Sequence, residues 1–184
     1  MIAGYARFRF LGRRLSFRFV LANIRKLSQR IDEDSSFSPE AIIAVNRSGA
    51  IAGAVLSGLL TDLTVRAPLV VPIKLERRDG QRVTSILPAV PNLTDLSRIL
   101  VLSCVNDTGS GLIAVLDWIN EKYPRIVFRT AAVYSNSTAI IQPNYVGESI
   151  NPNARISARK LETRMPWMVS GWHHDLPAER LIRS

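Results

Sequence analysis

Apolar residues along this chain form two patterns: a helical spacing and short consecutive runs. Over residues 15–31 they recur at helical spacing, and the polar stretch 32–38 closes that predicted helix. Short runs of consecutive apolar residues predict buried strands at 41–45, 69–75, 99–102 and 126–134. Helical spacing returns between these strands, at 50–60 and 110–122. The repeated order of strand, turn and helix predicts an α/β fold with a parallel twisted sheet flanked by helices.

Two segments depart from this alternation. Residues 76–82 read Glu-Arg-Arg-Asp-Gly-Gln-Arg between apolar flanks, and the Asp-Gly pair is a turn signal. We therefore expect an exposed hairpin or mobile flap over about 76–88. After Tyr134 the pattern loosens, and 142–148 reads as a turn followed by a short strand. We expect about 142–170 to form a small C-terminal hood or lid over the sheet edge.

The length of 184 residues, 47% of them hydrophobic, suits one domain with a full core. We expect a basic arm over 1–14 and a single domain over 15–184. Cys104 is the only cysteine, so the sequence carries neither a disulfide framework nor a cysteine-rich metal site. No apolar stretch approaches the ~18 residues of a membrane-spanning helix. These features predict a cytoplasmic protein that does not contact a membrane.

The formal charge of +9 is concentrated at the start of the chain, where no acidic residue precedes Asp32. One interpretation is an arm that touches nucleic acid. The other is an arginine-rich chain with an amphipathic first helix. A high net positive charge by itself indicates only non-specific attraction to anions. We therefore favour the second interpretation and keep nucleic-acid binding as the weaker alternative. A phosphate-rich small ligand would also be attracted.

Two glycine-containing loops follow predicted strands. The first reads Asn46-Arg47-Ser48-Gly49, and the second reads Asp107-Thr108-Gly109-Ser110-Gly111 at the start of a predicted helix. Unpaired N–H groups at such a start favour a phosphate dianion. Ligands of parallel sheets gather at the carboxyl ends of the strands, where both loops are expected. The simpler alternatives are a solvated loop arginine at 47 and a plain Asp-Thr-Gly helix cap.

These two loops, in this order, resemble those of the type I phosphoribosyltransferases, and most closely the xanthine and hypoxanthine-guanine branch of purine salvage. The charged tip between them and Tyr145-Val146 followed by Pro166-Trp167 extend the resemblance over roughly 20–170. It implies a pentosyltransferase that moves the phosphoribosyl group of phosphoribosyl pyrophosphate to a purine base and releases pyrophosphate. It also implies Mg²⁺ bound through the substrate. A homodimer is a further expectation.

The resemblance assigns roles to matching positions in this chain. Asp107 would exchange a proton with purine N7, although it could also cap the following helix. The 5′-phosphate would be bound by Thr108, Gly109, Ser110, Gly111 and Leu112. The pyrophosphate would be bound by Arg47, Ser48, Gly49 and Lys74, of which the lysine could equally face water. The base would be bound by Tyr145, Val146 and Trp167, although the tryptophan could instead pack in the core. None of these residues is expected to be a metal ligand.

The strongest departure from the family pattern is at Ser103 and Cys104. Relatives carry two acidic residues there, which hold the ribose hydroxyl groups. Exchanging two charged hydrogen bonds for one neutral bond loses about 2–5 kcal/mol of binding free energy. This departure supports an alternative function, a catalytically impaired module on the same fold that binds a sugar phosphate or nucleotide and regulates a partner. Which base or nucleotide is bound is left open, because relatives have an aromatic residue shortly before Pro-Trp and this chain has Leu161-Glu162-Thr163-Arg164.

Overall fold

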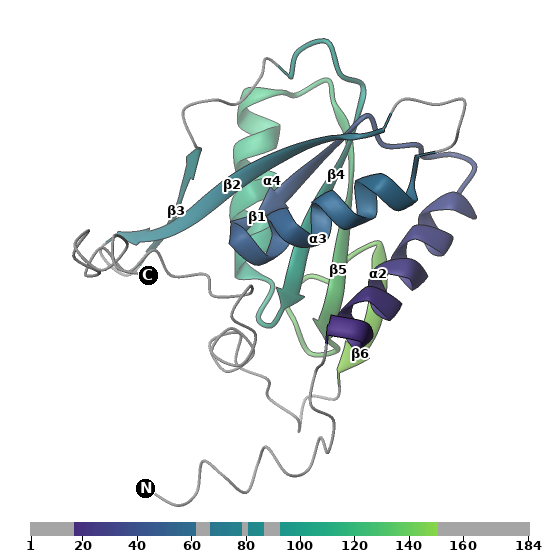
Figure 1. Cartoon of the computed structure of the whole chain (residues 1–184). Helices are drawn as coiled ribbons and strands as arrows, with labels where there is room; N and C mark the ends of the chain where they lie inside the picture. Colours follow the sequence, from purple (N-terminus) through teal and green to yellow (C-terminus); the bar gives the residue numbers. More distant parts are fainter. Residues whose placement is uncertain (1–16, 62–66, 79–80, 87–92, 151–184) are drawn as a thin grey trace, which may run out of the picture.

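A six-stranded sheet forms the centre of the molecule, in the order β3-β2-β1-β4-β5-β6 (Figure 1). The computed structural model describes residues 17–61, 67–78, 81–86 and 93–150. Its elements are α2 (Phe17–Asp32), β1 (Ala41–Val45), α3 (Asn46–Leu59), β2 (Leu69–Arg78), β3 (Gln81–Ile86), β4 (Arg98–Asn106), α4 (Ser110–Lys122), β5 (Val127–Asn136) and β6 (Tyr145–Ile150). Five strands run parallel, and only β3 is antiparallel to its neighbour.

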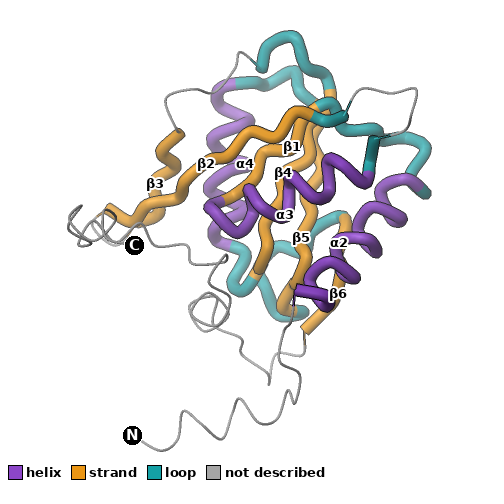
Figure 2. Tube along the Cα trace, viewed as in Figure 1, coloured by secondary structure: helices purple, strands orange, loops and turns teal. Residues whose placement is uncertain are grey.

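Helices cover both faces of this sheet, with α2 and α3 on one face and α4 on the other (Figures 1 and 2). Strand β1 is therefore buried along its whole length, which explains why its sequence is apolar without alternation. The stripe of α2 that faces the sheet is almost fully buried and consists of Val20, Ile24, Leu27 and Ile31. This arrangement confirms the predicted parallel α/β sheet flanked by helices.

Helix α3 begins earlier than predicted. Its first residue is Asn46, so the segment predicted as a loop forms the first helical turn. Asn46 has a positive φ of 61°, a conformation that asparagine tolerates better than most residues. Its side chain accepts a hydrogen bond from the backbone N–H of Leu75 at 2.9 Å. The chain therefore reverses at a single residue, and a hydrogen bond to strand β2 fixes that residue.

Strand β4 is longer than the predicted 99–102. It continues to Asn106 because β5 pairs with it as far as Ser135. Ser103 and Cys104 therefore lie within the strand, as expected for Cys104, and three residues or fewer before its end. Strands β2 and β3 form an antiparallel hairpin in the segment predicted as a flap, and the tip at 79–80 lies outside the described residues.

The short strand predicted near 142–148 is β6, which pairs in parallel with β5. The expected arm over 1–14 and the part of the expected hood after residue 150 lie outside the described residues. Within the described ranges, no helix is long and apolar enough to cross a membrane.

Candidate phosphate-binding site

The two glycine-containing segments lie at the same edge of the sheet. Strands β1 and β4 are parallel neighbours, with Val45 paired to Ser103, so their carboxyl ends open on one side (Figure 1). The first turn of α3 follows β1 there, and the turn before α4 follows β4. The first turn of α3 packs closely on β4, because a Cβ atom added to Gly49 would lie 3.2 Å from the carbonyl oxygen of Leu102.

The second segment forms a tight turn that opens α4. Gly109 precedes the helix with a φ of 88°, in the left-handed region that favours glycine. The hydroxyl oxygens of Thr108 and Ser110 are 2.9 Å apart, and Thr108 is exposed. Gly109, the N-cap residue, has no side chain that could cap this helix start, and the first turn of α4 contains no acidic residue. The Thr108 hydroxyl accepts a long hydrogen bond of 3.4 Å from the backbone N–H of Ser110. The positive end of the α4 dipole therefore lies beside two hydroxyl groups, which is an environment that a phosphate prefers.

Asp107 is half-buried at the beginning of this turn. Its Oδ1 accepts a hydrogen bond of 3.4 Å from Nδ2 of Asn136, the last residue of β5. Gly109, and not Asp107, is the residue at the N-cap position of α4. The Asp107 carboxylate lies at the beginning of the turn at 108–110, the candidate phosphate turn.

The predicted pyrophosphate residues are brought together around the start of α3. Ser48 and Gly49 are buried in its first turn, and Arg47 is half-buried beside them. Lys74 lies on the adjacent strand β2, one residue beyond the pair formed by Val45 and Ile73. This group places two cationic side chains near the edge at which β1 ends.

Ser103 and Cys104, near the end of β4, do not offer charged groups to a ligand. Cys104 is 1% exposed and belongs to the core cluster on the face covered by α2 and α3. The hydroxyl of Ser103 donates to the carbonyl oxygen of Val105, in its own strand, at 2.9 Å. Strand β4 therefore ends without a carboxylate before Asp107.

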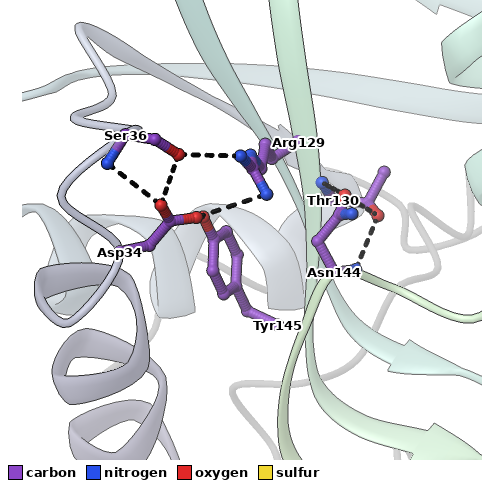
Figure 3. A network of polar contacts seen from close by, with 6 residues as sticks. All are labelled: Asp34, Ser36, Arg129, Thr130, Asn144 and Tyr145. Atoms are coloured by element: carbon purple, nitrogen blue, oxygen red, sulfur yellow. Dashed lines mark hydrogen bonds and ion pairs between the residues drawn. The ribbon is translucent and has the colours of Figure 1, made fainter.

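Tyr145 is not brought to the two loops. Its side chain is buried, its ring centroid lies 6.3 Å from that of Phe37, and its hydroxyl donates to Asp34 at 2.7 Å (Figure 3). Asp34 lies between α2 and β1, at the edge where the strands begin. Val146 is half-buried, and its carbonyl oxygen accepts a hydrogen bond from Arg30. Trp167 lies outside the described residues, so the predicted base-binding group is not assembled within them.

Asp34 is the centre of a polar network at that opposite edge (Figure 3). The backbone N–H and hydroxyl of Ser36 both donate to it, and the Arg129 guanidinium lies 3.2 Å away. The Ser36 hydroxyl, followed by the Tyr145 hydroxyl, lowers the pKa of the Asp34 carboxyl. Burial, followed by the hydrogen bond to Asp34, raises the pKa of Tyr145 to about 12. These contacts join the segment between α2 and β1 to strands β5 and β6, and they hold the Tyr145 side chain in place.

The sequence analysis did not identify two polar residues that lie beside the turn, Asn106 and Asn136. The buried Asn106 donates to Ser135 Oγ at 3.0 Å and to the carbonyl oxygen of Ile141 at 2.9 Å. The backbone N–H of Ile140 donates to the carbonyl oxygen of Thr108 at 3.0 Å. The loop between β5 and β6 is therefore fastened to the phosphate turn. An asparagine within the apolar run of β4 was the sequence signal for this contact.

Comparison with known proteins gives matches among solved structures only. No protein-family model matches the chain. No curated protein matches it either. A purine phosphoribosyltransferase from Pyrococcus horikoshii is 24% identical, with 74% of this chain and 86% of that protein covered and a TM-score of 0.61. A xanthine-guanine-hypoxanthine phosphoribosyltransferase from Helicobacter pylori is 21% identical, with coverages of 80% and 96% and a TM-score of 0.61.

A third similar structure is a Neisseria gonorrhoeae protein with bound ppGpp. It is 16% identical, with 73% of this chain and 81% of that protein covered and a TM-score of 0.55. At these identities the likeness concerns the arrangement of the elements. The chain has the type I phosphoribosyltransferase fold, and its structural neighbours include several enzymes of the purine branch.

Proposed function

We propose that this protein is a nucleobase phosphoribosyltransferase that transfers the phosphoribosyl group of phosphoribosyl pyrophosphate to a purine-type base. The observation that carries the proposal is the open turn at Thr108-Gly109-Ser110. It places an outward-facing helix start, two hydroxyl groups and Asp107 at the same sheet edge as Arg47. The enzymes among the similar structures support the reaction class.

The chemistry divides between the two segments. The turn at 108–110 binds the 5′-phosphate, because a phosphate dianion gains most from N–H groups at a helix start. Arg47 and the first turn of α3 stabilise the leaving pyrophosphate. A base nitrogen forms its bond to the anomeric carbon as the bond from that carbon to pyrophosphate breaks, and Asp107 takes the proton that the base loses. The protein contributes chiefly by positioning the reactants and stabilising developing charge.

The donors at this edge fit a magnesium ion that arrives on the substrate. Among the described residues there is no group of three or more His, Cys, Asp or Glu side chains placed to hold a metal ion. The oxygens of the diphosphate and ribose would therefore supply most of the ligands. When bound, the ion neutralises negative charge on the pyrophosphate.

A second candidate function is a module that binds a nucleotide or sugar phosphate without turning it over. It is favoured by Cys104, which is buried in the core, and by Ser103, whose hydroxyl donates to its own strand. Neither residue can replace a carboxylate that grips the ribose hydroxyl groups. The ppGpp-bound Neisseria gonorrhoeae structure shows this fold holding a nucleotide.

One experiment separates the two functions. The full chain is incubated with Mg²⁺, phosphoribosyl pyrophosphate and each common nucleobase, and nucleotide formation is measured beside calorimetric titrations with phosphoribosyl pyrophosphate, purine nucleotides and ppGpp. Turnover supports the transferase. Binding without turnover supports the binding module. If neither binding nor turnover is observed, both proposed functions are excluded. The double substitution Thr108→Val with Ser110→Ala removes both hydroxyls and should weaken binding, whereas Ser137→Ala, at an exposed residue of the β5–β6 loop, is the matched control.

A further inference from the structure

We propose that Asn136 is a positioning residue that sets the orientation of the Asp107 carboxylate beside the phosphate turn. The role in the reaction rests on the proposed transferase function, whereas the orientation itself is independent of it. Asn136 is the last residue of β5, and Asp107 directly follows β4, its parallel neighbour. The sheet therefore brings both side chains to the same edge.

The contact has a defined direction. Asn136 Nδ2 lies 3.4 Å from Asp107 Oδ1. Asn136 Oδ1 accepts hydrogen bonds from the backbone N–H of Thr138 at 3.1 Å and from its hydroxyl at 2.9 Å. Because a backbone N–H can only donate, the amide oxygen must face Thr138. The amide nitrogen therefore faces Asp107 and donates to it.

Asn136 is itself held in place by the loop that follows it. Its carbonyl oxygen accepts a hydrogen bond from Gln142 Nε2 at 3.1 Å, and the same nitrogen donates to Ala139. The loop is also joined to the turn through Ile140 and Thr108. The hydrogen bonds of the β5–β6 loop thus hold the Asn136 amide in position beside Asp107, and no ligand is needed for this.

This arrangement leaves the two carboxylate oxygens of Asp107 unequal. Asn136 engages Oδ1, which favours one rotamer of the Asp107 side chain and leaves Oδ2 to take the proton of the incoming base. Among the described side chains, Asn136 supplies the hydrogen bond to this carboxylate. Proton transfer requires the two partners to be within hydrogen-bonding reach, so a freely turning carboxylate would lose rate without losing substrate.

The test measures the Asp107 side-chain rotamer in the full chain by three-bond NMR couplings to its Cγ. Asn136→Ala removes the donor. Asn136→Asp keeps the acceptor for Thr138 and also removes the donor, so it serves if the alanine variant folds poorly. Ser137→Ala is the matched control, because it changes an exposed residue of the same loop and leaves Asn136, Gln142 and Asp107 in place. We expect one rotamer in the wild type and in Ser137→Ala, and averaging among rotamers in both Asn136 variants.

Turnover is measured on the same proteins. Asn136→Ala should lower kcat by roughly tenfold, and the KM for phosphoribosyl pyrophosphate should stay within about twofold. A single Asp107 rotamer in both Asn136 variants would overturn the proposal, as would equal averaging in Ser137→Ala. If the wild type showed no turnover, the proposed transferase function would fail, and the couplings would still decide whether Asn136 orients Asp107.

Discussion

Gly109 gives the phosphate turn a backbone conformation that a side chain would oppose. Its φ is 88°, and a Cβ atom added there would lie 2.9 Å from the backbone nitrogen of Ile141. Both the conformation and the contact act against any larger residue. The closeness of the β5–β6 loop, and not only the shape of the turn, therefore requires glycine at this position.

We expect Gly109→Ala to lower the free energy of unfolding by at least about 1–2 kcal/mol, the usual cost of a left-handed conformation for a residue with a Cβ atom. Ligand binding should fall further, because the loop must shift. Gly58→Ala is the control, since its helical position meets nothing within 4 Å, and it should be neutral or stabilise by up to about 1 kcal/mol. Urea unfolding and phosphoribosyl pyrophosphate titration measure both effects. Equal results for the two variants would contradict this account of the turn.

The two positions that lack the family acids should respond differently to restoration. Ser103→Glu changes a half-buried side chain, whereas Cys104→Asp places a carboxyl group in the core. A charged hydrogen bond contributes about 1.5–3 kcal/mol, so Ser103→Glu should strengthen phosphoribosyl pyrophosphate binding by roughly tenfold or more. Cys104→Asp should lower the free energy of unfolding by several kcal/mol, on the order of the cost of leaving a buried charge unpaired. Calorimetric titration measures the affinity of Ser103→Glu, and urea unfolding measures the stability of Cys104→Asp. Unchanged affinity in a folded Ser103→Glu protein would refute the first expectation.

At the scale of elements, the apolar pattern predicted regular segments well and their junctions poorly. Helix α4 has the predicted bounds because a periodic stripe and a glycine turn both mark it. The start of α3 was missed because one residue, Asn46, reverses the chain through a contact with β2, which is distant in sequence. The extension of β4 depends on its pairing with β5, which no local pattern reports.

The network around Asp34 predicts a pH dependence that belongs to the packing of the α2–β1 segment on β5 and β6. The folded-state pKa of Asp34 is lowered, chiefly by the Ser36 hydroxyl, so its contribution to stability is present above the unfolded value of about 3.9. That contribution is lost as the pH falls through the folded pKa. We expect Asp34→Asn to reduce stability at neutral pH, with a difference from wild type that shrinks below about pH 4.

Urea midpoints between pH 2.5 and 7 are the measurement for this expectation. Glu33→Gln is the control, because it removes an exposed carboxylate next to Asp34 and leaves the network of Ser36, Tyr145 and Arg129 in place. A constant difference between wild type and Asp34→Asn across this pH range would show that the network does not favour the ionised carboxylate.

At the scale of the whole molecule, the two edges of the sheet hold different groups. The carboxyl edge holds Asp107, Thr108 and Arg47, whereas the amino edge holds the Asp34 network. The sequence pointed to the first edge because its loops carry recognisable motifs. It grouped Tyr145 with that edge, whereas the structure bonds its hydroxyl to Asp34 at the other, since a motif gives the order of residues along the chain but not the edge that a side chain faces. Substitutions at one edge should therefore change ligand binding, and substitutions at the other should change stability.

The basic arm provides the remaining test at this scale. Removal of residues 1–14 takes away four arginines and no acidic residue. Because both proposed phosphate-binding segments lie within 46–49 and 107–111, we expect the shortened chain to bind phosphoribosyl pyrophosphate or nucleotides as the full chain does. Oligonucleotide binding at several salt concentrations completes the test, since each phosphate contact contributes about 0.9 to the slope of log K against log salt. A slope that falls by about two or more would identify the arm as a nucleic-acid contact, whereas an unchanged slope assigns its charge to general attraction.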